Sequence, residues 1–255
     1  MLSAWLGNGL DPAGVTVIDP GLDDAHRRDL ERQGVGVAAK AFDTSLKGSA
    51  KILVLAVKPQ TMDAVLPEVA GLAGPDTVVL SIAAGIRMAT LAPAFAEGQA
   101  IVRIMPNTPA QVGAGMAVAI ANDALKADDR ALVDALMAAT GATAWVDDEA
   151  LMDAVTAVSG SGPAYVFYLA ECLAAAGRAA GLDEALAEQL ARQTVVGGGA
   201  LLGAACEPAA VLRENVTSPG GTTAAALAVL MADDGLKPLL EKAVAAAKAR
   251  SIKLG

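Results

Sequence analysis

Apolar runs rich in β-branched residues alternate with helical stretches along the first 149 residues of the chain. Helical spacing is clear in residues 23–34 and 61–72. Apolar strands separated by helices are typical of a parallel sheet that is covered on both faces. The sequence therefore predicts an α/β domain. The runs that we expect to be strands are residues 15–19, 51–57, 77–83, 100–105, 115–120 and 143–148.

The strand pattern stops near Glu149, and Ala, Leu and Gly in helical spacing dominate the rest of the chain. We expect long helices at residues 161–181, 183–205 and 235–254. They are apolar nearly all round, which is more apolar surface than one small domain can bury alone. We therefore predict an N-terminally incomplete Rossmann-like domain in residues 1–149 and an all-α domain in residues 150–255 that pairs with a second copy.

Composition narrows the class of partner. The net charge is −9 and no Lys or Arg cluster is present, which argues against nucleic acid and an anionic membrane surface. Cys172 and Cys206 lie in apolar helical sequence and form no paired framework, as expected in a reducing cytoplasm. No membrane span or signal segment is evident. We expect a cytoplasmic protein that acts on a small molecule.

Metal chemistry is not expected. His26 is the only histidine, lies in a charged helical stretch and is interpreted as a structural surface residue. A histidine-based triad or metal site is therefore implausible, and no Cys or acidic cluster has metal-ligand spacing. Any chemistry should depend on an organic cofactor and backbone dipoles, with a hydroxyl group at most as proton donor.

The segment at residues 212–230 is the most unusual. Residues 218–221 break one helix, and Thr222 and Thr223 open the next. Glycines leave the following N–H groups exposed at the electropositive end of a helix, which suits a carboxylate. The plainer alternative is that one of the two threonines caps a buried helix.

Other loops have similar composition. In residues 158–167, Ser159 and Ser161 are potential caps and Pro163 suits a first helical turn, so helix packing and ligand contact both remain open. Loops at residues 58–60, 83–85 and 106–109 follow strands at their carboxyl ends. Ligands of open α/β sheets bind at that edge, and an extended cofactor would fit there. Lys58 alone would be an ordinary surface lysine.

Taken together, five motifs resemble those of the pyrroline-5-carboxylate reductases, and the match runs in order from about Leu2 to the C-terminus. The resemblance implies an N-terminal Rossmann domain and a helical domain that interlocks with a second subunit in a homodimer, which relatives often assemble further. It also implies hydride transfer from NADPH or NADH to the C=N bond of a cyclic imino acid, L-1-pyrroline-5-carboxylate. The product is L-proline, at the last step of its biosynthesis. The motifs are AVKPQ, SIAAGI, RIMPNTPA, AVSGSGPAYVF and ENVTSPGGTTAAAL.

The resemblance also implies roles for individual residues. It places the substrate carboxylate at the turn before residue 222 and gives Thr223 the catalytic role of hydrogen bonding to the ring nitrogen. Glu149 is expected near the bound ring. The substrate-binding residues implied are Glu149, Ser218, Gly220, Gly221, Thr222 and Thr223, and the cofactor-binding residues are Asp19, Pro20, Asp43, Ala56, Val57, Lys58, Pro59, Ile82, Ala83, Ala84 and Asn215.

Cofactor preference is left open by the residues near Asp19. An acidic residue at the end of the second strand bonds the ribose 2′-OH and repels a 2′-phosphate, which favours NADH. Arg27 and Arg28 follow it and offset that repulsion. Asp43 stands where many relatives have Asn, which leaves its adenine contact in doubt.

The start of the sequence departs from the family pattern. Relatives begin with a strand and a glycine-rich turn, whereas Met1 here falls inside the helix that follows that turn. We favour a start codon assigned too far downstream over a true truncation, because every later motif is intact. Losing two charge-assisted hydrogen bonds, worth roughly 1.5–3 kcal/mol each, would weaken cofactor binding by about two to four powers of ten.

Two rival interpretations remain. One is another imine or β-hydroxyacid reductase with the same two-domain plan. The other is a non-catalytic helical assembly or ligand-binding protein derived from a reductase. The helices from Gly160 to Gly203 contain no lysine, which argues against the hydroxyacid type. Cofactor-dependent turnover of pyrroline-5-carboxylate tests the non-catalytic one.

Overall fold

The computed structural model describes residues 1–254, which form two compact units. The first unit comprises Met1–Gly160 together with the chain from Lys248 onward, and the second comprises Ser161–Ala247. The division falls after Gly160, later than the domain boundary expected at residue 149. The end of the last helix also belongs to the first unit.

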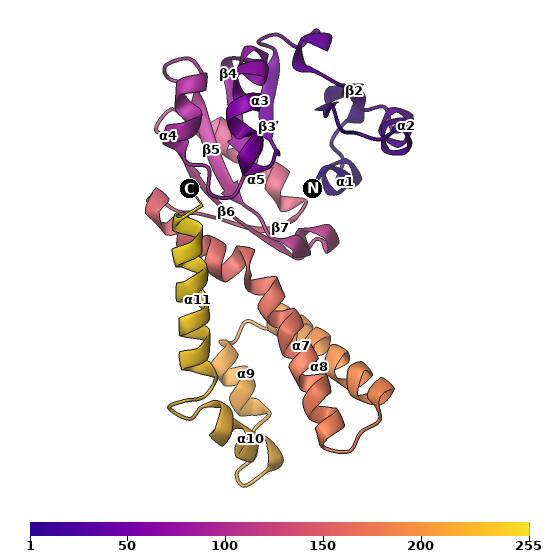
Figure 1. Ribbon diagram of the computed structural model, residues 1–255, viewed down its shortest axis with the longest axis vertical. Helices are drawn as coiled ribbons and strands as arrows, with labels where there is room; N and C mark the ends of the chain where they lie inside the picture. Colours follow the sequence, from indigo (N-terminus) through magenta and orange to yellow (C-terminus); the bar gives the residue numbers. More distant parts are fainter. Residues whose placement is uncertain (255) are drawn as a thin grey trace. The chain divides into compact units, whose positions relative to one another are not determined.

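The first unit contains a five-stranded sheet in the order β3-β4-β5-β6-β7 (Figure 1). Neighbouring strands are parallel except β5 and β6, which pair antiparallel. The α/β class is confirmed, but the expectation of a wholly parallel sheet is wrong at β6. Residues 106–114 join β5 to β6, and they are too few for the crossover that a parallel strand requires. The strands are β3 (Ala50–Leu55), β4 (Ala73–Ser81), β5 (Ala100–Met105), β6 (Gly115–Ala121) and β7 (Gly141–Trp145).

Each face of this sheet has its own core, because alternate residues of a strand point to opposite faces. On one face, Val102 is buried in a cluster with Met137 of α5. On the other face, Ile101 is buried in a cluster with Leu66 of α3 and Leu91 of α4. Burial on both faces explains why the strands are continuous apolar runs. The helices of this layer are α3 (Met62–Val69), α4 (Met88–Leu91), α5 (Ala127–Ala138) and α6 (Met152–Val155).

A separate two-stranded parallel sheet pairs β1 (Thr16–Ile18) with β2 (Gly36–Ala38). In the part of the chain that the structure describes, neither strand hydrogen bonds to the larger sheet. The sequence pattern predicted β1 but missed β2, whose few residues carry little periodic signal. The helices beside them are α1 (Leu2–Gly7) and α2 (Asp24–Arg32).

The second unit is helical, and the long helices expected there are confirmed. Helix α7 packs along α8 (Figure 1), where Gly177 allows close approach to Ala187. At the far end of α11, the Ser251 hydroxyl donates to Asp153 Oδ1 at 2.6 Å within the first unit. The helices are α7 (Gly162–Ala179), α8 (Glu184–Ala204), α9 (Ala209–Asn215), α10 (Thr222–Leu230) and α11 (Leu236–Ile252).

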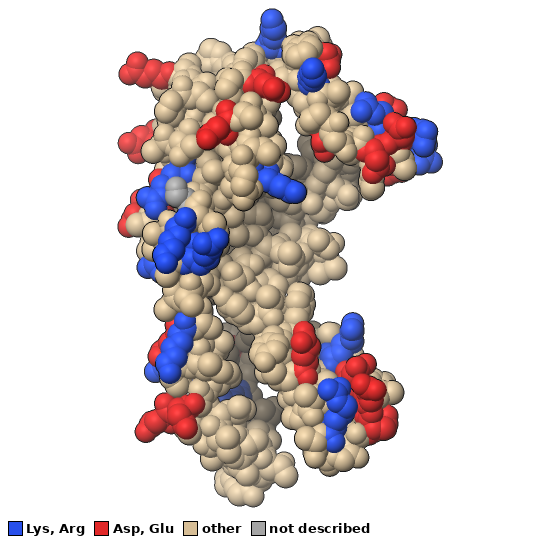
Figure 2. All heavy atoms as spheres, in the orientation of Figure 1, with Lys and Arg blue, Asp and Glu red and all other residues tan. Residues whose placement is uncertain are grey.

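The surface of the second unit is largely uncharged. Figure 2 shows charged side chains gathered mainly at the end of the α7 and α8 pair, and α9 and α10 are almost free of them on this face. Large apolar side chains are exposed on these helices, including Phe167, Leu190, Leu201 and Val229. Among the residues described, no helix is long and apolar enough to cross a membrane.

Candidate active site

The loops that follow β3 and β4 lie side by side at one edge of the sheet. The Ile82 N–H donates to the Leu55 carbonyl oxygen at 3.1 Å, which joins the start of the second loop to the end of β3. Ala56 and Ala84 are exposed, and Lys58 is exposed where a 3₁₀ turn, Pro59–Thr61, begins. Small residues and open backbone therefore line this edge, where ligands of parallel sheets bind. The predicted cofactor residues here are Ala56, Val57, Lys58, Pro59, Ile82, Ala83 and Ala84.

The predicted adenosine-side residues belong to the smaller sheet. Asp19 follows β1 directly, and its Oδ1 accepts the Gly21 N–H at 2.8 Å. Pro20 comes next, and Asp43 ends a 3₁₀ turn after β2; all three residues are exposed. An exposed carboxylate at the end of a parallel strand is placed to accept a hydrogen bond from a ribose hydroxyl.

Neither glycine of α1 forms a phosphate-binding turn. Helix α1 ends at Gly7, and Gly9 follows with φ +94°, in the left-handed region that favours glycine. Both glycines therefore lie at the C-terminal end of the helix, whereas a phosphate needs the free N–H groups of an N-terminal end.

Glu149 sits in a buried ion pair. Its Oε1 accepts the Met88 N–H at 2.8 Å and a hydrogen bond from Arg103 Nη1. Arg103 lies on β5 with 7% of its surface exposed, while the Glu149 side chain is 28% exposed. A charge buried this deeply requires a partner. The resemblance implied that Glu149 lies near the substrate ring, but Arg103 was not predicted, although one charged residue in the apolar run AIVRIM is a readable signal.

Asn107 connects β5 to the serine-glycine segment. Its side-chain amide donates to the Ser159 carbonyl oxygen at 3.2 Å, and its Oδ1 accepts the Met116 N–H at 2.8 Å. Ser159 lies in a π-helical turn, Thr156–Gly160, a feature that is frequent at functional sites. A Cβ on Gly160 would come within 2.5 Å of Met105 Cε, so the turn lies against the end of the Met105 side chain of β5.

In the second unit, the turn before α10 leaves the helix N-terminus uncapped. The helix N-cap is Gly221, and no side chain caps the helix, so neither threonine takes the capping role of the plainer interpretation. Gly220 has φ +70°, and a Cβ on Gly221 would come within 2.5 Å of Ser218 Oγ. The chain thus bends tightly between Ser218 and Thr222, and the first N–H groups of α10 have no side-chain acceptor.

The remaining candidates of this unit are near that turn in sequence. Asn215 ends α9 and is exposed, Thr222 is exposed and Thr223 is half-buried. The hydroxyl of Thr217 donates to the Arg213 carbonyl oxygen at 2.6 Å, which stabilises the end of α9. In the serine-glycine segment, Pro163 occupies the first turn of α7, as predicted.

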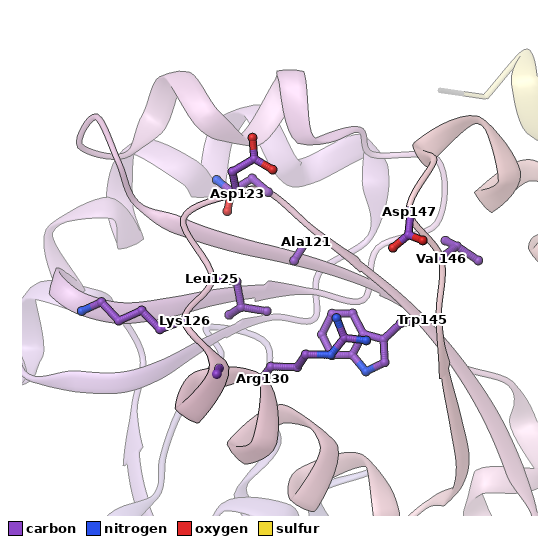
Figure 3. Close-up of a pocket in the computed structure, with 10 residues that line it drawn as sticks. Ala121, Asp123, Leu125, Lys126, Arg130, Trp145, Val146 and Asp147 are labelled. Carbon is purple, nitrogen blue, oxygen red and sulfur yellow. The ribbon is translucent and has the colours of Figure 1, made fainter.

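A shallow pocket of about 250 Å³ lies elsewhere in the first unit (Figure 3). The Arg130 guanidinium lies 4.2 Å from the centre of the Trp145 ring, whose Nε1 donates to Asp134 at 2.7 Å. Ala121, which also lines the pocket, pairs with Val102 near the start of β5. None of the predicted site residues lines this pocket, so we do not assign it to the site.

His26 lies on the surface of α2. Its Nδ1 is 2.6 Å from Asp23 Oδ2, and this hydrogen bond, reinforced by the carboxylate charge, raises the pKa of His26. No group of three or more potential metal ligands occurs within residues 1–254. Cys172 and Cys206 are exposed and unpaired.

An α/β unit with loops of small residues at the carboxyl ends of parallel strands, followed by a helical unit, is a two-domain Rossmann-type architecture. Residues 149–254 match the family model for pyrroline-5-carboxylate reductase dimerisation, so this part of the chain is a domain that supports homodimer or oligomer formation. The chain is 44% identical to pyrroline-5-carboxylate reductase of Synechocystis, over 90% of this chain and 84% of the relative.

Solved structures agree with this relationship. The chain resembles pyrroline-5-carboxylate reductase of Coxiella burnetii with a TM-score of 0.91 and 34% identity, covering 100% of this chain and 93% of the other. It resembles the Plasmodium falciparum enzyme, solved with NADP bound, with a TM-score of 0.81 and 28% identity at the same coverage. The chain belongs to the pyrroline-5-carboxylate reductase family.

Replacing Asn107 by Ala should loosen the π-helical turn, and Asn122→Ala provides a matched control. The Asn122 side chain forms hydrogen bonds with Gln99 and Ile101 near the start of β5. The Asn107 side chain likewise forms hydrogen bonds with Ser159 and Met116 near the end of β5. Each variant should lose about 1–3 kcal/mol of stability, measured by urea unfolding. Hydrogen–deuterium exchange of residues 156–160 should accelerate only in Asn107→Ala. Equal acceleration in both variants would contradict the role of Asn107.

Proposed function

We propose that this chain reduces L-1-pyrroline-5-carboxylate to L-proline with hydride from NADPH or NADH. The observation that carries the proposal is the uncapped N-terminus of α10 behind Gly220 and Gly221. Its free N–H groups and helix dipole provide a site for one small carboxylate. Family membership supplies the reaction, and this turn supplies a place for the substrate's anionic group.

The reaction requires the protein mainly to position the substrate against the cofactor. A protonated cyclic imine is already electrophilic, and the nicotinamide supplies the hydride when bound. The N–H groups at Thr222 and Thr223 bind the carboxylate and so fix the orientation of the ring. The Thr223 hydroxyl donates a hydrogen bond to the ring nitrogen and stabilises the amine as it forms.

We assign the dinucleotide to the first unit and carboxylate binding and dimerisation to the second. Residues 56–59 and 82–84 form adjacent loops in which Ala56, Lys58 and Ala84 are exposed, and Asp19 offers an exposed carboxylate for a ribose hydroxyl. These donors and acceptors fit the two ends of a dinucleotide. Asn215, exposed at the end of α9, is proposed to reach the cofactor.

The proposed assembly is a homodimer through the helical unit. Gly197, Gly198 and Gly199 lie inside α8, and a Cβ on any of them would meet nothing within 4 Å. A glycine in a helix interior costs about 1 kcal/mol relative to Ala, and this chain alone gains no packing in return. A second copy lying close against α8 accounts for both the glycines and the exposed apolar side chains. Exposed unpaired cysteines fit a cytoplasmic location.

Replacing Thr223 by Val removes the hydroxyl group but keeps the backbone N–H groups that are proposed to bind the carboxylate, so it tests the two roles separately. We expect kcat for pyrroline-5-carboxylate to fall by about 10²-fold or more, the range for a positioned proton donor, with little change in KM. Thr222→Val is the matched control and should keep kcat, because only the hydroxyl of residue 223 faces the ring in the proposal. Equal losses would refute the assignment, and a wild-type chain without turnover would favour the non-catalytic ligand-binding alternative.

Cofactor preference tests the role of Asp19. Wild type should use NADH better than NADPH at equal concentration, because the carboxylate repels a 2′-phosphate. Asp19→Ser should raise kcat/KM for NADPH relative to NADH by about tenfold or more, the scale of one charged hydrogen bond. A strong preference of wild type for NADPH would contradict this role.

A bulky residue on the glycine face of α8 should disrupt the dimer. We expect Gly198→Leu to lower the mass measured by light scattering toward that of one chain, while its helix content in circular dichroism is retained. Ala25→Leu, at an exposed position of α2, is the control and should leave the mass unchanged. A dimer that persists in Gly198→Leu would place the interface elsewhere.

A further inference from the structure

The loop between β4 and α4, residues 82–87, has both ends attached to Arg103. In the sheet, Arg103 on β5 is the register partner of Ser81, the last residue of β4. At the other end, the loop leads into Met88, whose N–H donates to Glu149 Oε1 at 2.8 Å. The same Glu149 oxygen accepts from Arg103 Nη1, so the closing contact returns to β5, the strand that pairs with the end of β4.

The residues around the contact between Arg103 and Glu149 are largely buried. Ser81 is 1% exposed and Arg103 is 7% exposed, so this stretch of the ladder is not open to water. Within the loop, Gly85 turns the chain with φ +80°, and Ala83 is buried while Ala84 is exposed. A short loop fixed at both ends presents its exposed backbone in one position, which reduces the ordering cost of binding a ligand.

We propose that Arg103 is a positioning residue for the reduction, because it holds Glu149 and, through it, the start of α4, which fixes the dinucleotide loop at residues 82–87. This inference rests on the proposed function, which places the dinucleotide on that loop. Glu149 closes the loop through its Oε1, which accepts hydrogen bonds from both Met88 and Arg103. Arg103 touches neither ligand and acts through these contacts.

The first test removes the charge with a side chain of similar length. Arg103→Met should raise KM for the dinucleotide and lower kcat/KM by about tenfold or more, since small misplacements of reacting groups can cost up to about 10²-fold. Hydrogen–deuterium exchange of the backbone amides of residues 82–88 should also accelerate. Arg103→Lys keeps one donor and the charge, and should recover most of both losses.

Lys51→Met is the matched control, because Lys51 on β3 pairs with the buried Asp129 of α5 at 2.6 Å. It should lower the melting temperature, yet leave the dinucleotide KM and the exchange of residues 82–88 unchanged. A rise in KM in Lys51→Met, or a lower melting temperature without kinetic change in Arg103→Met, would reduce Arg103 to a stabilising residue and overturn the proposal.

A double-mutant cycle tests the route through Glu149. The double variant Arg103→Met with Glu149→Gln should raise KM for the dinucleotide no more than Arg103→Met alone, because both changes break one connection. Multiplied increases in KM would show that the residues act independently and would contradict the proposal.

A failure of the proposed function can be distinguished from a failure of the positioning role proposed for Arg103. If wild type turns over no pyrroline-5-carboxylate, the proposed reaction is wrong, while NADH titration followed by fluorescence and hydrogen–deuterium exchange of residues 82–88 still test the contact between Arg103 and Glu149. NADH that binds without protecting residues 82–88 in wild type, or no binding at all, would overturn the role of this loop.

Discussion

The positive charge of Arg103 has to be neutralised inside the first unit, and the organisation of the sheet edge follows from how this is done. An isolated buried guanidinium would be strongly destabilising, so a carboxylate must come to it. Glu149 provides that carboxylate from the segment after β7, and its oxygen also accepts the first N–H of α4. One interaction therefore joins β5, the loop after β4 and the start of the segment that leads to the helical unit.

Local patterns in the sequence predicted the elements better than their connections. The run AIVRIM was assigned to a strand with the bounds that the structure gives, and Pro163 marked the start of α7. The direction of β6 depends on the length of the connection before it, which strand periodicity does not contain. The bonds between Asn107 and Ser159, and between Arg103 and Glu149, join residues far apart in the chain, so no local pattern could reveal them.

The two units divide the proposed work by their physical character. The first supplies fixed loops at the carboxyl ends of β3 and β4. The second supplies an uncapped helix N-terminus and an apolar surface with glycines that pack against nothing in the chain itself. Its match to a dimerisation domain gives these features a common explanation, because a partner can bury the apolar side chains and approach the glycines closely.

A crystal structure of the assembled protein with NAD⁺ and L-proline would test the account most directly. It should show the dinucleotide along residues 56–59 and 82–84, with Arg103 still bonded to Glu149. The proline carboxylate should accept N–H groups at the start of α10, and Thr223 Oγ1 should lie within hydrogen-bond distance of the ring nitrogen. A dinucleotide bound elsewhere, for example beside Arg130 and Trp145, or a proline carboxylate away from α10, would contradict it.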